Sequence, residues 1–262
     1  MPRRIVLHAG FHKTGTSSVQ QTLRANRAVL KPALAMRLKG QMGDLMHATR
    51  GYSTWRDPLT LAKATRRFGA LLDDLPNMPR RCLVISAEEL SGHMPGRGDL
   101  MDYNAAPILM RKFSKAITAR YPKAEQVIYF STRAPDSWLN SAYWEHVKSS
   151  SMTLDFDEFA TSYAKAADFD QIVAQTRKAV GCEVHHTRLE DCTELRLGPT
   201  DPLLDLCDIP DDIRAQIIAQ PMANTRHSDA VLLALLAANR AYDDRDARKA
   251  AKHAILAKGA QT

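Results

Sequence analysis

The chain has 262 residues, 45% hydrophobic and 25% charged, and its 36 Lys and Arg against 29 Asp and Glu give a formal net charge of +7. These fractions are those of an ordinary globular protein, long enough for one α/β domain or two small ones. No stretch approaches the ~20 apolar residues that span a bilayer, and the apolar run behind Arg3 and Arg4 is too short for a signal-peptide core. We therefore expect a cytoplasmic location and no membrane span.

The excess positive charge is spread along the chain, and no run holds four or more Lys or Arg residues. Basic residues do not alternate with aromatic ones either, so the sequence predicts no nucleic-acid partner and suits a small anionic ligand. The four cysteines, Cys82, Cys182, Cys192 and Cys207, form no C-x-x-C pair. We expect free thiols, mostly buried, and neither a zinc knuckle nor a redox motif.

The chain opens with a strand, a loop and a helix. An apolar run over residues 5–9 predicts a buried strand, and a loop from Gly10 to Gly15 follows it. Val19 and Leu23, four positions apart, then predict a helix. Strand, glycine-bounded loop and helix in this order direct backbone N–H groups towards a phosphate-like anion, so we expect an anion site here.

This loop differs at one position from the P-loop of nucleoside triphosphatases, G-x-x-x-x-G-K-[ST]. Its glycines have the required spacing and Ser17 supplies the final hydroxyl, but Thr16 stands where the lysine is needed. The only lysine, Lys13, lies inside the loop. The sequence therefore favours a smaller anionic donor over triphosphate–magnesium chemistry.

The segment after this first unit is expected to be helical over 28–38 and then interrupted by glycines, with a mobile part within 40–56. Apolar residues from Leu61 to Leu75 predict a helix that Asp57 or Thr60 caps. The continuous apolar run 82–86 predicts a strand buried on both faces of a parallel sheet. Residues 91–102, rich in Gly and Pro, are expected to form a lid or a substrate rim.

Helices and strands alternate over most of the remaining chain. The expected elements are a helix over 104–120, a strand over 126–131, a helix over 136–148, helices near 155–165 and 168–180, a strand over 183–188, short helices over 199–222 and helices up to the C-terminus. Asp168 is the expected N-cap and Gly181 the expected C-cap of the helix at 168–180. This alternation predicts a three-layer α/β/α fold with a central parallel sheet. We expect one domain over 1–262, with a helical cap from about residue 199.

A second motif follows the strand expected at 126–131. Arg133 lies at the end of that strand, and Ser141 lies in the next helix. The planar fork of an arginine fits phosphate oxygens, and a serine adds a hydroxyl donor. Together with the first loop, this motif predicts a site with two anion-binding ends.

The two motifs together resemble the sulfotransferase family. Residues 13–17 match its loop K-[ST]-G-[ST]-[ST], and Arg133, Pro135, Ser141 and Tyr143 match its motif R-[DN]-P-x-x-R-x-x-S-x-Y. The resemblance implies a fold like that of P-loop nucleoside triphosphate hydrolases and the cofactor 3′-phosphoadenosine 5′-phosphosulfate (PAPS), which leaves as 3′,5′-adenosine bisphosphate. It also implies that no metal is needed.

Three features depart from the family pattern. Ala134 replaces an acidic or amide residue, and Trp138 replaces a second arginine. The C-terminal loop G-x-x-G-x-x-K is absent. The polar, basic stretch Asn224–Ser228 is a candidate replacement for it.

The resemblance also implies roles for individual residues. The implied cofactor-binding set is His12, Lys13, Thr14, Gly15, Thr16, Ser17, Ser18, Arg133 and Ser141. In this scheme Lys13 stabilises the leaving oxygen, and Arg133 with Ser141 grips the 3′-phosphate. Bases of the family often lie just after the strand that 82–86 resembles. Glu88 is therefore the expected catalytic base, with Glu89, His12 and His93 as alternatives.

The expected acceptor is a small molecule, a sugar or a lipid, contacted by residues 40–56, 91–102 and those after Tyr143. Two other functions stay open. A P-loop kinase or nucleotide hydrolase would need a lysine at position 16 and an acidic strand end for magnesium. A non-catalytic protein that binds adenosine bisphosphate would need no base. His8, in an apolar strand, is expected to be a core histidine.

Overall fold

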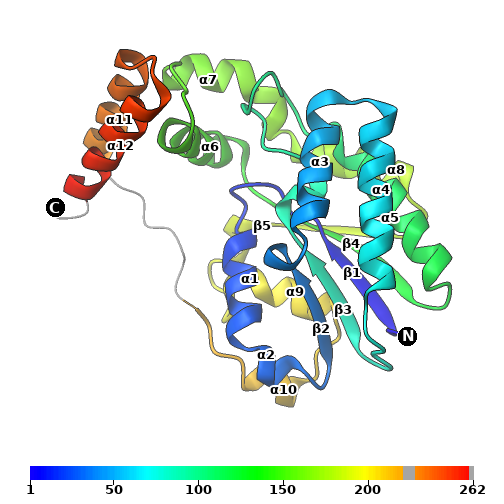
Figure 1. Ribbon diagram of the computed structural model, residues 1–262. Helices are drawn as coiled ribbons and strands as arrows, with labels where there is room; N and C mark the ends of the chain where they lie inside the picture. Colours follow the sequence, from blue (N-terminus) through cyan, green and yellow to red (C-terminus); the bar gives the residue numbers. More distant parts are fainter. Residues whose placement is uncertain (221–227, 260–262) are drawn as a thin grey trace.

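A computed structural model describes residues 1–220 and 228–259. Its centre is a five-stranded sheet in the order β2-β3-β1-β4-β5, in which every neighbouring pair is parallel. The strands are β1 Arg4–His8, β2 Leu34–Leu38, β3 Cys82–Ser86, β4 Glu125–Thr132 and β5 Glu183–Arg188. The predicted α/β fold with a central parallel sheet is confirmed (Figure 1).

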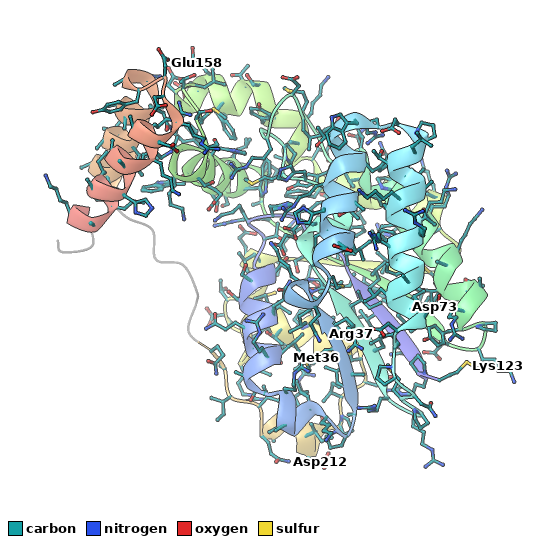
Figure 2. All side chains as sticks on the ribbon, viewed as in Figure 1. Met36, Arg37, Asp73, Lys123, Glu158 and Asp212 are labelled. Atoms are coloured by element: carbon teal, nitrogen blue, oxygen red, sulfur yellow. The ribbon has the colours of Figure 1, made fainter. Side chains whose placement is uncertain are left out.

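Helices cover both faces of the sheet (Figure 1). One face carries α3 Gly43–Trp55, α4 Pro58–Asp73, α5 Ala106–Arg120 and α8 Phe169–Ala179. The other face carries α1 Thr16–Ala25, α2 Arg27–Leu30, α9 Asp201–Leu206 and α10 Asp211–Ala215. The side chains drawn in Figure 2 fill the space between these layers.

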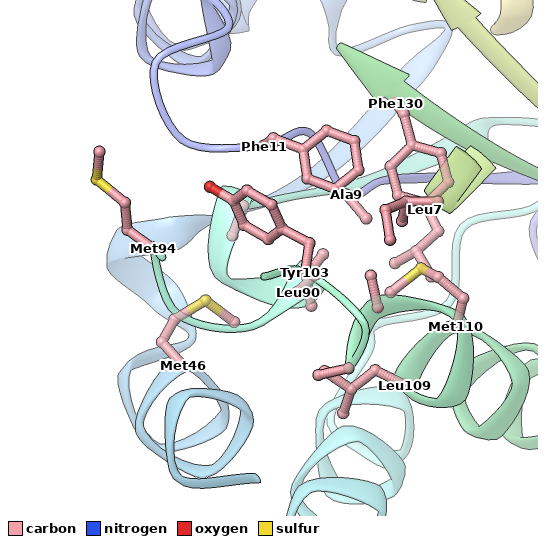
Figure 3. Close-up of a cluster of buried hydrophobic side chains, with 14 of the residues drawn as sticks. Leu7, Ala9, Phe11, Met46, Leu90, Met94, Tyr103, Leu109, Met110 and Phe130 are labelled. Carbon is pink, nitrogen blue, oxygen red and sulfur yellow. The ribbon is translucent and has the colours of Figure 1, made fainter. Parts of the chain in front are cut away.

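The central strand β1 is buried on both faces because its apolar side chains alternate between two cores. Ile5 and Leu7 join the core under α3, α4, α5 and α8, whereas Val6 joins the core under α1. Phe11, just beyond β1, packs against Tyr103 and Phe130 at ring-centroid distances of 4.7 and 5.2 Å (Figure 3). The strand is therefore fixed from both sides up to the start of the loop.

The strand order places a crevice at the carboxyl end of β1. After β1 the chain crosses to β2 and β3 on one side, and it then returns to β4 on the other side. His8 at the end of β1 lies opposite Ser86 of β3 and Tyr129 of β4. Open parallel sheets bind ligands at such a switch point, outside the carboxyl ends of the strands.

Two predictions for residues 28–56 were wrong. Residues 34–38 form the edge strand β2 instead of a helix, with Leu34, Met36 and Leu38 buried at every second position. Residues 43–55 form the continuous helix α3 instead of an interrupted segment. In α3 the buried stripe that includes Leu45 and Tyr52 outweighs the cost of Gly51.

The predicted N-caps of two helices are confirmed, and the predicted C-cap of one helix is wrong. Asp57 Oδ1 accepts hydrogen bonds from the N–H groups of Leu59 and Thr60, at 2.9 and 3.1 Å, and so caps α4. Asp168 caps α8 as predicted. The C-cap of α8 is Val180 in an extended conformation, and not Gly181, so this helix ends without a left-handed turn.

The last two helices, α11 Asp229–Ala241 and α12 Arg245–Gly259, lie beside α6 Pro135–Ser149 and α7 Phe156–Tyr163, away from the sheet (Figure 1). The buried ammonium of Lys252 on α12 donates to Val147 O, Ser150 O and Asn239 Oδ1 at 2.6, 2.7 and 2.8 Å. It therefore ties the C-terminal pair to the end of α6. Within the described ranges, no helix is long and apolar enough to cross a membrane.

Candidate functional site

The loop after β1 has its shape fixed through its carbonyl groups. Phe11 O accepts from Thr14 Oγ1 at 2.6 Å, His12 O from Trp138 Nε1 at 2.8 Å, and Lys13 O from Arg133 Nη1 at 3.2 Å. Three consecutive carbonyls are thus held by side chains. Phe11 N–H donates to Ser131 O at 3.3 Å, and the later N–H groups of the loop are the donors left for other partners.

Helix α1 begins directly at this loop. Gly15 is its N-cap, with φ of 93°, and no side chain caps the helix there. The first backbone hydrogen bond runs from Val19 N–H to Gly15 O, at 3.2 Å. The preceding N–H groups and the positive end of the helix dipole are therefore available to an anion.

Two glycines leave space that a side chain would fill. A Cβ at Gly10 would lie 2.5 Å from Thr16 Oγ1, and a Cβ at Gly15 would lie 2.8 Å from Leu189 Cδ1. Thr16 Oγ1 is buried without a hydrogen-bond partner among the described residues. A buried hydroxyl of this kind, at the start of a helix, is suited to a ligand oxygen.

Arg133 and Ser141 lie on the same cavity as the loop, although they are more than a hundred residues away in sequence. Arg133 follows β4, and Ser141 lies on α6. The cavity has a volume of about 1150 Å³ and also reaches Ser137 and Asn140 of α6, which the sequence reasoning missed. Ligand cavities are commonly of roughly 300–1,000 Å³, so this one has room for more than one small molecule.

Trp138 explains one departure from the family motif. It stands where the motif has an arginine, yet its ring is fully buried and its indole N–H holds His12 O. Tyr143, which matches the motif, is also buried, and its hydroxyl donates to Leu154 O at 3.0 Å. Both residues hold the structure around the cavity and do not line it.

Glu88 and Glu89 follow β3 in a short 3₁₀ segment and line the cavity. The Lys39 ammonium bridges them, 2.6 Å from Oε1 of each, and Arg50 Nη2 lies 2.5 Å from Glu89 Oε1. Burial raises the pKa of Glu89, but Lys39 and Arg50 outweigh it and hold this pKa below its ordinary value. Oε2 of each glutamate is buried without a hydrogen-bond partner within the described part of the chain.

His12 lies beside these glutamates, and the candidate ligand atoms of His12, Glu88 and Glu89 lie within 4.8 Å of one another. Three such groups can hold a metal ion, but the Lys39 ammonium already lies between the two carboxylates. Burial lowers the pKa of His12 to about 3. At this pKa the ring is neutral at physiological pH, and the hydroxyl of Tyr103, 3.2 Å from His12 Nδ1, fixes its orientation.

Lys13 reaches across the cavity to α6, where its Nζ lies 3.1 Å from Glu145 Oε2. Lys148 lies 3.5 Å from the same oxygen. Burial raises the pKa of Glu145, but Lys13 and Lys148 lower it to about 2. Glu145 was not among the predicted site residues, although it lies one helical turn after Ser141 and the helix prediction could have found it.

The structure brings most of the predicted site residues together. His12, Lys13, Gly15, Thr16, Ser17, Ser18, Glu88, Glu89, His93, Arg133 and Ser141 all line the cavity. Thr14 is buried beneath the loop and does not line it. His8 is the expected core histidine, with Ser86 and Ser131 hydroxyls 2.9 and 2.8 Å from its ring nitrogens.

The three segments expected to contact the acceptor each contribute to the far side of the cavity. They supply Arg50 of α3, then His93, Met94 and Arg97 of the loop before α5, and Trp144 and Lys148 of α6. The candidate replacement loop Asn224–Ser228 lies outside the described residues except at Ser228. Comparisons of the chain with protein-family models, with curated proteins and with solved structures found no match.

Proposed function

We propose that this protein is a sulfotransferase that moves a sulfuryl group from PAPS to a hydroxyl or amine acceptor by in-line displacement. One observation carries the proposal. Four residues of the loop line one cavity with Arg133 and Ser141, namely Lys13, Gly15, Thr16 and Ser17, and Arg133 is hydrogen-bonded to the loop itself. A ligand with an anionic group at each end fits this arrangement.

The residues present fit PAPS as a ligand. The start of α1 and the unpartnered hydroxyl of Thr16 would hold the 5′-phosphosulfate. Arg133 and Ser141 would hold the 3′-phosphate, because a guanidinium and a hydroxyl both donate to phosphate oxygens. When bound, PAPS supplies the sulfuryl group, whose sulfur is the electrophile in the transfer.

The proposed chemistry assigns one step to each of two residues. Glu88 Oε2, which has no hydrogen-bond partner among the residues described, takes the proton of the acceptor hydroxyl while Lys39 holds Oε1 in place. The acceptor oxygen then bonds to sulfur as the bond from sulfur to the bridging oxygen breaks. Lys13 donates a hydrogen bond to that departing oxygen and stabilises its growing charge.

The nucleotide preference tests this proposal. We expect 3′,5′-adenosine bisphosphate to raise the melting temperature more than AMP, ADP or ATP do, because only a 3′-phosphate reaches Arg133 and Ser141. The Arg133→Gln and Ser141→Ala variants should remove this preference. A larger shift with ATP, or metal-dependent ATP turnover, would favour a kinase or hydrolase instead.

The base is tested separately. We expect Glu88→Gln to lose about 10²–10⁴-fold in turnover while it keeps nucleotide binding, because an amide cannot take a proton. Turnover close to wild type in this variant would exclude Glu88 and leave Glu89, His12 and His93. Nucleotide binding without transfer in the wild-type protein would indicate a non-catalytic binding protein.

A further inference from the structure

Arg97 is a half-buried arginine on the loop between β3 and α5, and its guanidinium faces the far side of the cavity. Nη1 and Nη2 donate to Ser149 O and Ser149 Oγ, at 3.3 and 2.5 Å, where α6 ends. A cation is favourable at a helix C-terminus, so these contacts have a structural role. They use only part of the five N–H donors of a guanidinium.

The charge pairing of the cavity sets Arg97 apart. Each other Lys or Arg side chain that lines the cavity has a carboxylate within 4.0 Å. These pairs are Lys13 with Glu145, Lys39 with Glu88 and Glu89, Arg50 with Glu89, Arg133 with Glu190, and Lys148 with Glu145. Between residues 1–220 and 228–259, no such partner is found for Arg97. Burial and Arg50 lower the pKa of Arg97, and the Glu145 carboxylate raises it only in part, so this half-buried charge is incompletely balanced unless a ligand supplies a counter-ion.

The surroundings of Arg97 are positively charged, and they contain hydrogen-bond donors that have no partner in the described chain. Burial, Arg50 and Arg97 lower the pKa of His93 to about 4. Burial, followed by Arg97, lowers the pKa of His146 to about 4. Arg50 Nε and His93 Nδ1 are also buried without a hydrogen-bond partner in the described chain. Arg50, His93 and Arg97 thus form one wall, which we call the anion wall.

Helix α6 separates the anion wall from the end that holds Arg133. Ser141 and Ser149 are eight residues apart, which is about 12 Å along a helix. Glu145, which meets Lys13, lies midway between them. The order along α6 is therefore the Arg133–Ser141 pair, then Lys13, then Arg97, so the anion wall lies beyond the proposed point of transfer.

We propose that the anion wall binds an anionic group carried by the acceptor itself, either a carboxylate or a sulfate or phosphate ester. This proposal rests on the proposed function, which puts the donor at the loop and leaves the far side for the acceptor. Arg97 supplies a charged fork, and Arg50 Nε adds a donor from α3. Neutral acceptors lack the counter-charge that this wall needs.

The test compares Arg97→Gln and Arg97→Lys with wild type. Arg66→Gln, which makes the same change at an exposed arginine of α4 outside the cavity, is the matched control. Each protein is saturated with 3′,5′-adenosine bisphosphate and titrated with sodium sulfate or sodium acetate at constant ionic strength, and binding is followed by NMR. Sulfate reports on an ester group and acetate on a carboxylate.

We expect Arg97→Gln to weaken binding of at least one anion by about tenfold or more, because a charge-assisted hydrogen bond is lost. Arg97→Lys should retain part of the affinity, and Arg66→Gln should match wild type. Equal anion affinities in wild type and Arg97→Gln overturn the proposal. Ser149→Ala, which removes one anchor of Arg97 but no charge, should keep anion binding. A loss there as large as in Arg97→Gln also overturns the proposal, because the end of α6 would then be responsible.

The two proposals fail in different ways. Arg97→Gln should bind 3′,5′-adenosine bisphosphate as wild type does, because Arg97 lies beyond the donor end. If the wild-type protein binds no such nucleotide, the proposed function fails. The anion titration repeated without nucleotide then still reports whether Arg97 binds an anion.

Discussion

The two halves of the cavity are built in different ways. The loop half, residues 10–18, owes its shape to the backbone, with Lys13 and Gly15 at φ of 66° and 93° and three carbonyls held by side chains. The ion-pair half, made of Lys39, Arg50, Glu88 and Glu89, owes its shape to charged side chains from three separate segments. The loop half thus depends on local conformation, whereas the other half depends on the complete fold.

The largest expected effect concerns the charge that the loop half presents. On the proposed mechanism, Lys13→Ala should reduce turnover about 10²–10³-fold, because the departing oxygen loses its charged donor. The measurement is the rate of sulfuryl transfer from PAPS. Lys63→Ala, on the exposed face of α4, is the control and should transfer at the wild-type rate. Wild-type turnover in Lys13→Ala would remove Lys13 from the mechanism.

Removing a carboxylate from the ion-pair half should destabilise the whole fold. Glu89→Gln leaves Arg50 without its carboxylate partner and Lys39 with Glu88 alone, at an expected cost of about 2–3 kcal/mol in the free energy of unfolding. Urea unfolding measures this change. Asp73→Asn breaks the exposed pair with Arg120 and should cost less than about 1 kcal/mol. Equal costs for the two variants would contradict the comparison of the two halves.

The loop half should respond most to a change of backbone. Gly15→Ala places a Cβ at a left-handed position and against Leu189, and should cost about 1–2 kcal/mol in the free energy of unfolding. Gly69→Ala lies in the interior of α4, where no described residue outside the backbone of the helix itself comes within 4 Å of the new Cβ, and should instead stabilise by about 0.5–1 kcal/mol. Thermal or urea unfolding of both variants shows whether each substitution raises or lowers the free energy of unfolding. A stabilised Gly15→Ala would show that the loop is not held in this conformation.

A further expected effect is the pH dependence of the pair that joins the loop half to α6. Lys13 and Lys148 overcome burial and lower the pKa of Glu145 from 4.5 to about 2. The folded state therefore binds fewer protons than the unfolded state between these values, so this stability is present above about pH 4.5 and is lost towards pH 2. Glu145→Gln should flatten the acid limb of a stability–pH curve. An unchanged acid limb would mean that the pair contributes nothing to stability.

The sequence predicted those parts of the fold that depend on short segments. The strands at 82–86 and 126–131 and the loop between Gly10 and Gly15 are visible as local patterns and are present in the structure. The edge strand β2 was missed because its five residues lie next to a short helical turn, and their alternation is brief. Local pattern therefore predicted four of the five strands, including the edge strand β5, and missed only the edge strand β2.

The prediction of the site was limited in the same way, because a local sequence pattern does not show which distant segments pack together. Residues of the loop and the strand ends could be selected because their roles follow from sequence position. Lys39, Arg50 and Arg97 reach the cavity only after three segments pack together, and no spacing in the sequence links them to Glu88. Glu145 was within reach, since it lies on the same helix as Ser141.

The contacts of Lys252 have a consequence for the order in which the protein can mature. Ser141 and Glu145 lie on α6, whose C-terminal carbonyl groups are held by an ammonium that follows more than a hundred residues later in the chain. During synthesis, the loop and both motifs leave the ribosome long before α12 does. A nascent chain can therefore form the sheet and the loop before Lys252 is synthesised, and the tie from Lys252 to the end of α6 forms only after that.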